Sequence, residues 1–303
     1  MTVQALLFDV DGTLVRTNAA HVDAWLDAFN AYHYNVGRER VEAEIGKGGD
    51  LLVPTVLGRD AEVLHGDALR RAHDDAFRTR IARGGVRLFE GAEGILADAR
   101  RRGLRTALVT SSKDEDLELL ERSSGQRFTA WVDVVTTAED AQISKPAPDL
   151  VEVACGKLGE DPLVCAMVGD SLHDAGAARA AGVAFLGVTT GFADPEAFAA
   201  AGARFIAPDL VKLRSSLMHA LSAACPSHVL FDDAILAAMM DSALEAARVG
   251  LAQGELPIGA AIFDREGRLR VKVDSGTLRA EQVGTWAVVG SLGATQLGAP
   301  WSV

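Results

Sequence analysis

Two aspartates, Asp9 and Asp11, follow the apolar run at residues 3–8, and Gly12 comes next. A short apolar run of this kind predicts a buried parallel strand, and the glycine predicts a sharp turn at its carboxyl end. In open α/β sheets, ligands bind at that end of the strands. Two carboxylates so close can divide the work, because one can attack while the other handles a proton and its carbonyl holds a cation. The alternative is a surface turn, where Asp-Gly is common.

A second apolar run, at residues 106–109, ends in the hydroxyl residues Thr110, Ser111 and Ser112. Hydroxyls and backbone N–H groups where a strand meets a helix can bind a phosphoryl oxygen. The alternative is that Ser111 or Ser112 only caps the helix expected to begin near Lys113.

Further along the chain, Lys145 precedes Pro146 just before a helical stretch. A lysine in this place would offset the charges of a carboxylate and a phosphate, which otherwise repel each other. The alternative is an ordinary exposed lysine.

A third apolar run, at residues 166–169, leads into Asp170 and Asp174. Mg²⁺ binds through few carboxylates, several waters and a substrate phosphate, so these acids are candidate ligands. Asp174 would bind through water or anchor the loop. We interpret His173 as a solvated neighbour of this site.

The four segments, in this order, resemble the four motifs of the haloacid dehalogenase-like hydrolases, most of which cleave phosphate esters. The resemblance implies that Asp9 forms an aspartyl-phosphate and that Asp11 is the general acid and base. Thr110, Ser111 and Lys145 would bind the phosphoryl group. The implied Mg²⁺ ligands are Asp9, the backbone carbonyl of Asp11, Asp170 and Asp174.

The elements that must position these residues alternate between strand and helix, which predicts an α/β fold with a doubly wound parallel sheet. Further strands are predicted at residues 183–188 and 203–206, and a helix from 208 to about 224. We assign residues 1–17 and 87–224 to this Rossmann-like core.

Residues 18–86 are predicted to form an inserted α-helical cap, because apolar residues recur at helical spacing over 21–29 and 61–81. Such a cap closes over a site, excludes water and selects the leaving group. The glycine-rich break at residues 45–50 contains Lys47, which either reaches the substrate or is solvated in a flexible turn.

Residues 225–303 form a linker and a short appended α/β segment, whose opening at residues 240–263 resembles a cytidine or adenosine deaminase domain. That domain needs a zinc site built from His and Cys, and no His or Cys follows His228. We therefore expect an incomplete deaminase-like segment, as in a truncated or frame-shifted fusion. The alternative is a β-rich accessory tail that packs on the hydrolase, in which Trp286 and Trp301 are either packing residues or exposed hydrophobic residues available to a partner.

The net charge of −12 disfavours nucleic-acid and anionic-membrane partners, and no apolar run approaches a membrane span. Three scattered cysteines and an N-terminus without a signal-like segment favour a cytoplasmic protein. The sequence is compatible with a homo-oligomer and does not fix the oligomeric state.

The sequence therefore predicts a Mg²⁺-dependent phosphatase acting on a small phosphorylated metabolite such as phosphoglycolate or a sugar phosphate. One alternative is a β-phosphoglucomutase-like phosphosugar mutase, which shares all four motifs. A second alternative is a non-catalytic module in which the C-terminal tail is an assembly element.

Overall fold

The computed structural model describes residues 2–225, 233–254, 258–263, 269–274 and 286–291. The chain forms two compact units, residues 1–226 and residues 227–303. Within the ranges described, no helix is both long and apolar enough to cross a membrane.

A six-stranded parallel sheet lies at the centre of the first unit and confirms the predicted α/β core. Its strand order is β3-β2-β1-β4-β5-β6. Strands β2 and β3 are added on one side of β1 and strands β4 to β6 on the other, so the order of the strands switches between β1 and β4. Ligands bind at such a switch in open α/β sheets, at the carboxyl ends of the strands. The strands are β1 (Ala5–Phe8), β2 (Arg105–Val109), β3 (Val134–Thr136), β4 (Cys165–Gly169), β5 (Ala184–Val188) and β6 (Phe205–Ala207).

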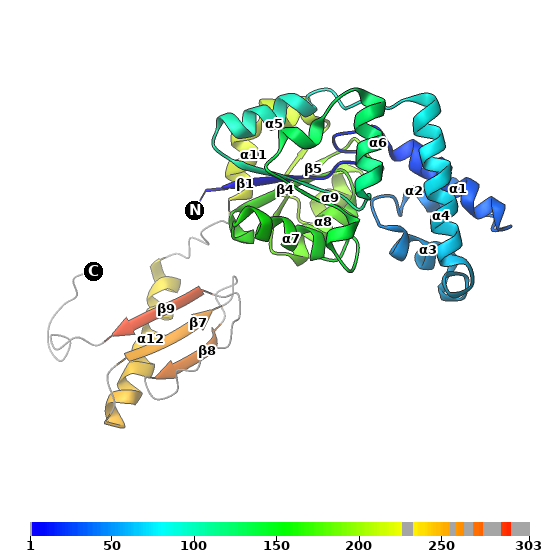
Figure 1. Ribbon diagram of the computed structural model, residues 1–303. Helices are drawn as coiled ribbons and strands as arrows, with labels where there is room; N and C mark the ends of the chain where they lie inside the picture. The colour runs from blue at the N-terminus through cyan, green and yellow to red at the C-terminus, as the bar shows by residue number, and fades with distance from the viewer. Residues whose placement is uncertain (1, 226–232, 255–257, 264–268, 275–285, 292–303) are drawn as a thin grey trace. The chain divides into compact units, whose positions relative to one another are not determined.

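Helices cover both faces of this sheet because its strands are apolar on both sides. In β1, Leu6 and Phe8 join one hydrophobic cluster, whereas Ala5 and Leu7 join the other. Figure 1 shows α5 (Ala92–Arg101) and α11 (Leu217–Ala224) on one face, and α7 (Asp149–Leu158), α8 (Leu172–Ala180) and α9 (Pro195–Ala200) on the other.

The remaining helices of this core are α6 and α10 together with three short 3-10 turns. They are α6 (Asp114–Ser124), α10 (Leu210–Ser215), η1 (Phe128–Trp131), η2 (Ala138–Asp140) and η3 (Pro162–Val164). The single helix predicted from residue 208 to 224 is wrong in one respect, because it is two helices that meet at Ser216. The side chain of Asp209 caps α10 by accepting a hydrogen bond from the Lys212 amide.

Four helices lie between β1 and the core helix α5, and they confirm the helical pattern predicted for residues 21–29 and 61–81. They are α1 (Asn18–Ala31), α2 (Arg38–Glu42), α3 (Gly49–Leu57) and α4 (Arg59–Gly84). They share a hydrophobic cluster that includes Trp25, Phe29 and Leu69. Phe77 and Ile81, near the end of α4, instead pack into a cluster of the sheet. We call these four helices the cap.

The second unit pairs one helix with an antiparallel three-stranded sheet of order β8-β7-β9. Its elements are α12 (Asp233–Ala252), β7 (Ile258–Phe263), β8 (Leu269–Asp274) and β9 (Trp286–Ser291). A Cβ at Gly259 would lie 2.2 Å from the Ala243 carbonyl oxygen, so the glycine permits the close approach of α12 to β7. The α/β character predicted for this appended segment is confirmed by α12 and β7, while Trp301 lies outside the described residues.

Candidate active site

Asp9, at the carboxyl end of β1, lies in a buried group of opposite charges. The ammonium of Lys145 lies 2.5 Å from Asp9 Oδ1 and 2.8 Å from Asp174 Oδ1, and it also donates to the Val109 carbonyl. Burial alone would lower the pKa of Lys145, but the two carboxylates raise it above its usual value. Lys145 is therefore a fixed cation, 1 % exposed, beside Asp9.

The carboxylates of Asp9, Asp170 and Asp174 come together at this point, with one oxygen of each within 4.8 Å of the others. Burial and the neighbouring Asp174 raise the pKa of Asp9 well above its usual value, and they raise the pKa of Asp170 to about 7. With Lys145 included, three carboxylates and one ammonium leave two negative charges. A divalent cation would cancel this excess, so the side chains fit a Mg²⁺ site.

Asp170 and Asp174 differ in how their oxygens are held. Thr13 Oγ1 donates to Asp170 Oδ1 at 2.9 Å, and Asn18 Nδ2 donates to Oδ2 at 2.8 Å. Asp174 accepts from Lys145 through one oxygen, and from the amide and hydroxyl of Ser171 through the other. Asp174 thus anchors Lys145 and the start of α8, which was one of its two predicted roles.

Asp11 accepts hydrogen bonds at both carboxylate oxygens. Thr17 Oγ1 and His21 Nε2 contact Oδ1 at 2.7 and 3.2 Å, while Ser112 Oγ and Thr110 Oγ1 donate to Oδ2 at 2.7 and 3.2 Å. Burial alone would raise the pKa of Asp11, but these contacts, led by His21, lower it below its usual value. The carboxylate is therefore an ionised acceptor in this arrangement.

The hydroxyl residues after β2 differ in their hydrogen-bond partners. Thr110 Oγ1 donates to Asp11 and accepts from the Ser112 amide. Ser111 Oγ is buried without a hydrogen-bond partner among the described residues, and it lines the cavity described below. Neither serine caps α6, because the N-cap position is Lys113. Ser111 therefore has an unused donor at the place where the sequence predicted phosphoryl binding.

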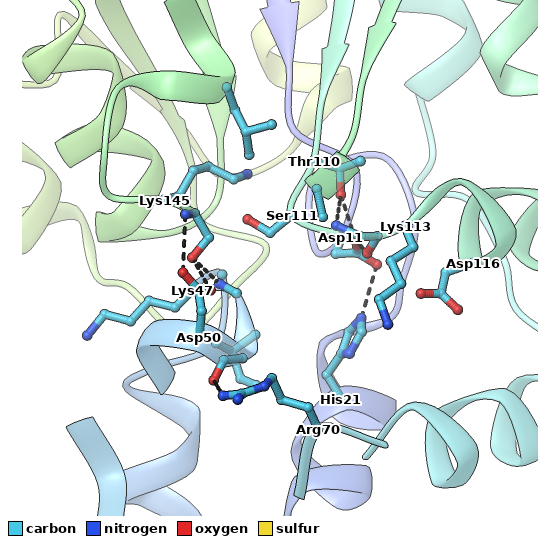
Figure 2. A pocket seen from close by; sticks show the side chains of 18 of the residues that line it. Asp11, His21, Lys47, Asp50, Arg70, Thr110, Ser111, Lys113, Asp116 and Lys145 are labelled. Carbon is cyan, nitrogen blue, oxygen red and sulfur yellow. Dashed lines mark hydrogen bonds and ion pairs between the residues drawn. The ribbon is translucent and has the colours of Figure 1, made fainter. Parts of the chain in front are cut away.

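A cavity of about 320 Å³ is lined by both the core and the cap. It brings together Asp9, Asp11, Thr110, Ser111 and Lys145, all of which the sequence predicted for one site. Figure 2 shows Asp11, Thr110, Ser111 and Lys145 on the core side, with His21, Asp50 and Arg70 opposite them on the cap.

Lys47 also lines the cavity, but its ammonium pairs with Glu44 and contacts Thr55 Oγ1 at 3.4 Å. Figure 2 shows its side chain extending away from Asp11. Its predicted contact with substrate stays a prediction.

The glycine-rich loop around Lys47 is in contact with the core. A Cβ at Gly46, where φ is +103°, would lie 2.6 Å from Ser171 Oγ. Asp50 Oδ1 accepts from Ser144 Oγ at 2.6 Å, and His173 Nε2 contacts the Ala43 carbonyl at 3.2 Å. His173 is half-buried and joins the core to the cap, a contact that the sequence did not predict.

The sequence reasoning missed the side chains that hold the aspartates in place. Thr13 and Asn18 bind Asp170, whereas Thr17 and His21 bind Asp11. Thr17 is the N-cap of α1, and Asn18 and His21 lie in its first turn, where the helical pattern indicates structure and not chemistry. Only their nearness to Asp11 in the sequence could have drawn attention to them.

Comparison with known proteins agrees with this geometry. A model of the haloacid dehalogenase-like hydrolase family matches residues 3–182, which is more than half of the chain. The chain is a haloacid dehalogenase-like hydrolase. The matched range contains all four of the predicted motifs.

Two curated relatives and one solved structure resemble this hydrolase over most of their length. Protein CbbY of Cupriavidus necator is 31% identical over 69% of this chain and 86% of its own length. An N-acetylmuramic acid 6-phosphate phosphatase of Pseudomonas aeruginosa is 29% identical over 65% of this chain and 86% of its own. The crystal structure of CbbY from Rhodobacter sphaeroides in complex with phosphate has a TM-score of 0.58 at 26% identity, covering 70% of this chain and 96% of that one.

The family and these relatives identify the hydrolase as an enzyme that cleaves phosphoric monoesters. The non-catalytic alternative is thereby set aside. The same comparisons do not support the deaminase-like resemblance of the C-terminal segment, because the family match ends at residue 182.

Proposed function

We propose that this hydrolase is a Mg²⁺-dependent phosphatase that cleaves a small-molecule phosphate monoester through an aspartyl-phosphate on Asp9. The observation that carries the proposal is the buried contact between Asp9 and Lys145 at the end of β1, within the same cavity as Asp11. A carboxylate with a raised pKa needs such a cation to stay ionised and to attack a phosphate.

In the first step, a carboxylate oxygen of Asp9 bonds to phosphorus while the bond from phosphorus to the leaving oxygen breaks. Asp11, which is ionised in the substrate-free arrangement, takes up a proton for this step and gives it to that oxygen, which leaves as an alcohol. Lys145 lowers the repulsion between nucleophile and phosphate, and the free hydroxyl of Ser111 donates to a phosphoryl oxygen.

In the second step, Asp11 takes a proton from water as the water oxygen attacks phosphorus. The bond from phosphorus to Asp9 breaks, and inorganic phosphate leaves. The cap wall of the cavity would limit water to this one molecule.

The acids that would hold Mg²⁺ are Asp9 and Asp170, with the backbone carbonyl of Asp11. When bound, the ion supplies charge neutralisation for the phosphoryl oxygens. Asp174 contributes by fixing Lys145 and the turn at Ser171.

The substrate class follows from cavity size and from the relatives. A cavity of about 320 Å³ suits a small phosphorylated metabolite. One relative is named for N-acetylmuramic acid 6-phosphate, and another was crystallised with phosphate. A phosphosugar mutase would use the same residues, so only the reaction products distinguish phosphatase activity from mutase activity.

The test is a panel of phosphorylated metabolites incubated with the purified hydrolase and Mg²⁺, with release of inorganic phosphate as the readout. We expect at least one phosphate monoester to give stoichiometric phosphate, and excess chelator to abolish its release. Conversion of β-glucose 1-phosphate to the 6-phosphate without free phosphate, in the presence of a bisphosphate primer, would contradict the proposal.

A further inference from the structure

A continuous row of hydrogen-bonded side chains leads from Asp11 through the cap and back to the core. His21 Nε2 lies 3.2 Å from Asp11 Oδ1, and His21 Nδ1 lies 3.2 Å from His73 Nε2. His73 Nδ1 lies 3.1 Å from Asp74 Oδ1, and Lys113 Nζ donates to Asp74 Oδ2 at 2.7 Å. Every nitrogen of the two imidazoles therefore has one partner.

Ring packing fixes both imidazoles in this row. His21 of α1 stacks on Phe77 of α4 with centroids 3.9 Å apart, and His73 of α4 stacks on Trp25 of α1 at 4.1 Å. His73 is 8 % exposed. Because neither ring is free to turn over, each nitrogen keeps the partner it has.

The end of the row at Asp74 determines where the protons lie. Burial would raise the pKa of Asp74, but His73 and Lys113 lower it to about 2, so Asp74 is an ionised carboxylate that can only accept. His73 Nδ1 must then carry a hydrogen. Burial lowers the pKa of His73 to about 4, so the ring is neutral and its Nε2 is an acceptor.

The hydrogen positions on His21 follow from those on His73. Because His73 Nε2 accepts, His21 Nδ1 must carry the hydrogen that it donates. His21 Nε2 then faces Asp11 with one hydrogen between the two groups, since two bare acceptors at 3.2 Å would repel each other.

We propose that His73, held by Asp74, is a positioning residue that fixes the tautomer and orientation of His21 and so keeps one proton at the contact between His21 and Asp11. This inference rests on the proposed function, in which Asp11 supplies a proton to the leaving group. Figure 2 shows the contact from His21 to Asp11 at the cavity.

The proton that each of the two steps needs is then supplied or taken back by the residues of this row. As the bond from phosphorus to the leaving oxygen breaks, the ionised Asp11 takes the proton held at His21 Nε2 and passes a proton to that oxygen, which leaves His21 with its one hydrogen on Nδ1. As water attacks the aspartyl-phosphate, Asp11 takes a proton from the water, and His21 Nε2 recovers its own. His73 and Asp74 keep their protons throughout, so no external acid or base is needed.

The first test is the tautomer of the wild-type full chain. Histidine ¹⁵N NMR at neutral pH should show His73 as a neutral ring protonated at Nδ1, and His21 with Nδ1 protonated. A neutral His73 with its hydrogen on Nε2 would overturn the proposal, whatever the activity of the protein.

The second test separates positioning of a proton from structural support. His73→Phe keeps an aromatic ring to stack on Trp25 but removes the acceptor, whereas His73→Gln keeps a carboxamide oxygen that can accept from His21. His65→Phe is the matched control, because His65 is a cap histidine that bonds Tyr34 and does not line the cavity.

The readout compares two leaving groups. Release of 4-nitrophenolate needs no protonation, whereas an alkoxide leaving group does, and a general acid contributes roughly 10²–10⁴-fold to such a step. We expect His73→Phe to lower kcat for an alkyl phosphate at least tenfold more than kcat for 4-nitrophenyl phosphate. His73→Gln should restore most of that loss, and His65→Phe should change neither.

Equal changes with both substrates, or no change with either, would overturn the role of His73. A wild-type chain that hydrolyses neither compound, and no other phosphate monoester, would instead overturn the proposed function. If His73→Phe failed to fold, the leaving-group comparison in His73→Gln and the NMR assignment would still decide the question.

Discussion

At the residue scale, the pKa values of the aspartates of the site differ mainly through the hydrogen-bond and charge partners of each carboxylate. Asp9 lies against a single ammonium and two other carboxylates, so its pKa rises. Asp11 accepts from Thr17, His21 and two hydroxyls after β2, so its pKa falls. One fold region thus gives two neighbouring acids opposite pKa shifts in the metal-free protein, so Asp9 needs Lys145 and a bound cation to be ionised as a nucleophile, and Asp11 needs a proton source to act as a general acid.

The role of Asp9 gives the first prediction. Asp9→Asn should lower kcat by about a thousandfold or more, because an amide cannot form the acyl-phosphate. Lys145 keeps Asp174 as a partner, so the thermal unfolding curve should stay cooperative. The measurement is steady-state phosphate release alongside circular dichroism, with Glu118→Gln on the surface of α6 as a control. A folded variant with a tenth of wild-type activity would show that Asp9 is not the nucleophile.

The raised pKa of Asp170 gives the second prediction, which concerns stability. The usual pKa of an aspartate, about 3.8, rises to about 7 in the folded protein. A folded state with the higher pKa binds the proton more tightly, so its stability decreases as the pH rises toward 7 and above. Below about pH 6.5 the buried neutral His73 opposes this trend, because its folded pKa is lowered.

We therefore expect the metal-free hydrolase to have a higher Tm at pH 6.5 than at pH 8, by about 3 °C or more. Added Mg²⁺ should raise Tm more at pH 8, because at lower pH the ion must displace protons from Asp9 and Asp170. Differential scanning calorimetry in chelator and in Mg²⁺ measures both effects. Asp170→Asn should reduce the pH dependence, with the remainder coming from Asp9, whose pKa is also raised, and a Tm that rises from pH 6.5 to 8 would refute the assignment.

At the element scale, the loop between α2 and α3 and the start of α3 contact the core beside Lys145. Gly48 donates its amide to Ser144 Oγ at 3.1 Å, and Ser144 donates to Asp50. Ser144 precedes Lys145 in the sequence, so closure of the cap and placement of the catalytic ammonium share one segment. We name the contact between Asp50 and Ser144 the cap latch.

The cap latch gives the third prediction. Asp50→Ala and Ser144→Ala should each lower kcat/KM about fivefold, since one hydrogen bond contributes about 1 kcal/mol. The double variant should be little worse than either single variant, because both remove the same interaction. The control is Glu118→Ala, which breaks a surface pair with Arg122 away from the cavity. Effects of the two single variants that simply add would show that the latch does not act as a unit.

The elements also show how far sequence reasoning reaches. The strands of the core sheet other than β3, and the four motifs, could be predicted, because apolar runs that end in acids or hydroxyls are local patterns. The break of the last core helix at Ser216 could not be predicted, because its residues favour a helix throughout. The contacts of His173 with Ala43 and of His73 with His21 join residues far apart in the chain, and no local pattern encodes them.

At the scale of the whole molecule, the catalytic parts are confined to the first compact unit. The family match covers residues 3–182, and the last helix of the sheet domain ends at Ala224. Every residue that lines the cavity comes before residue 151. The second unit has its own helix and antiparallel sheet, so each unit has a separate core.

This division gives the last prediction. A chain ending at Cys225 should keep kcat/KM within about twofold of the full chain, because every residue that lines the cavity belongs to the first unit. The truncated chain should also bind Mg²⁺ with unchanged affinity.

The second unit should hold no catalytic zinc, since residues 229–303 contain neither His nor Cys and such a site needs three protein ligands of that kind. Phosphate release and metal analysis of both chains are the measurements. One tightly held zinc per full chain that is lost on truncation, or release of ammonia from cytidine or adenosine, would overturn this view of the C-terminal unit. A folded but inactive truncated chain would show that the second unit takes part in catalysis.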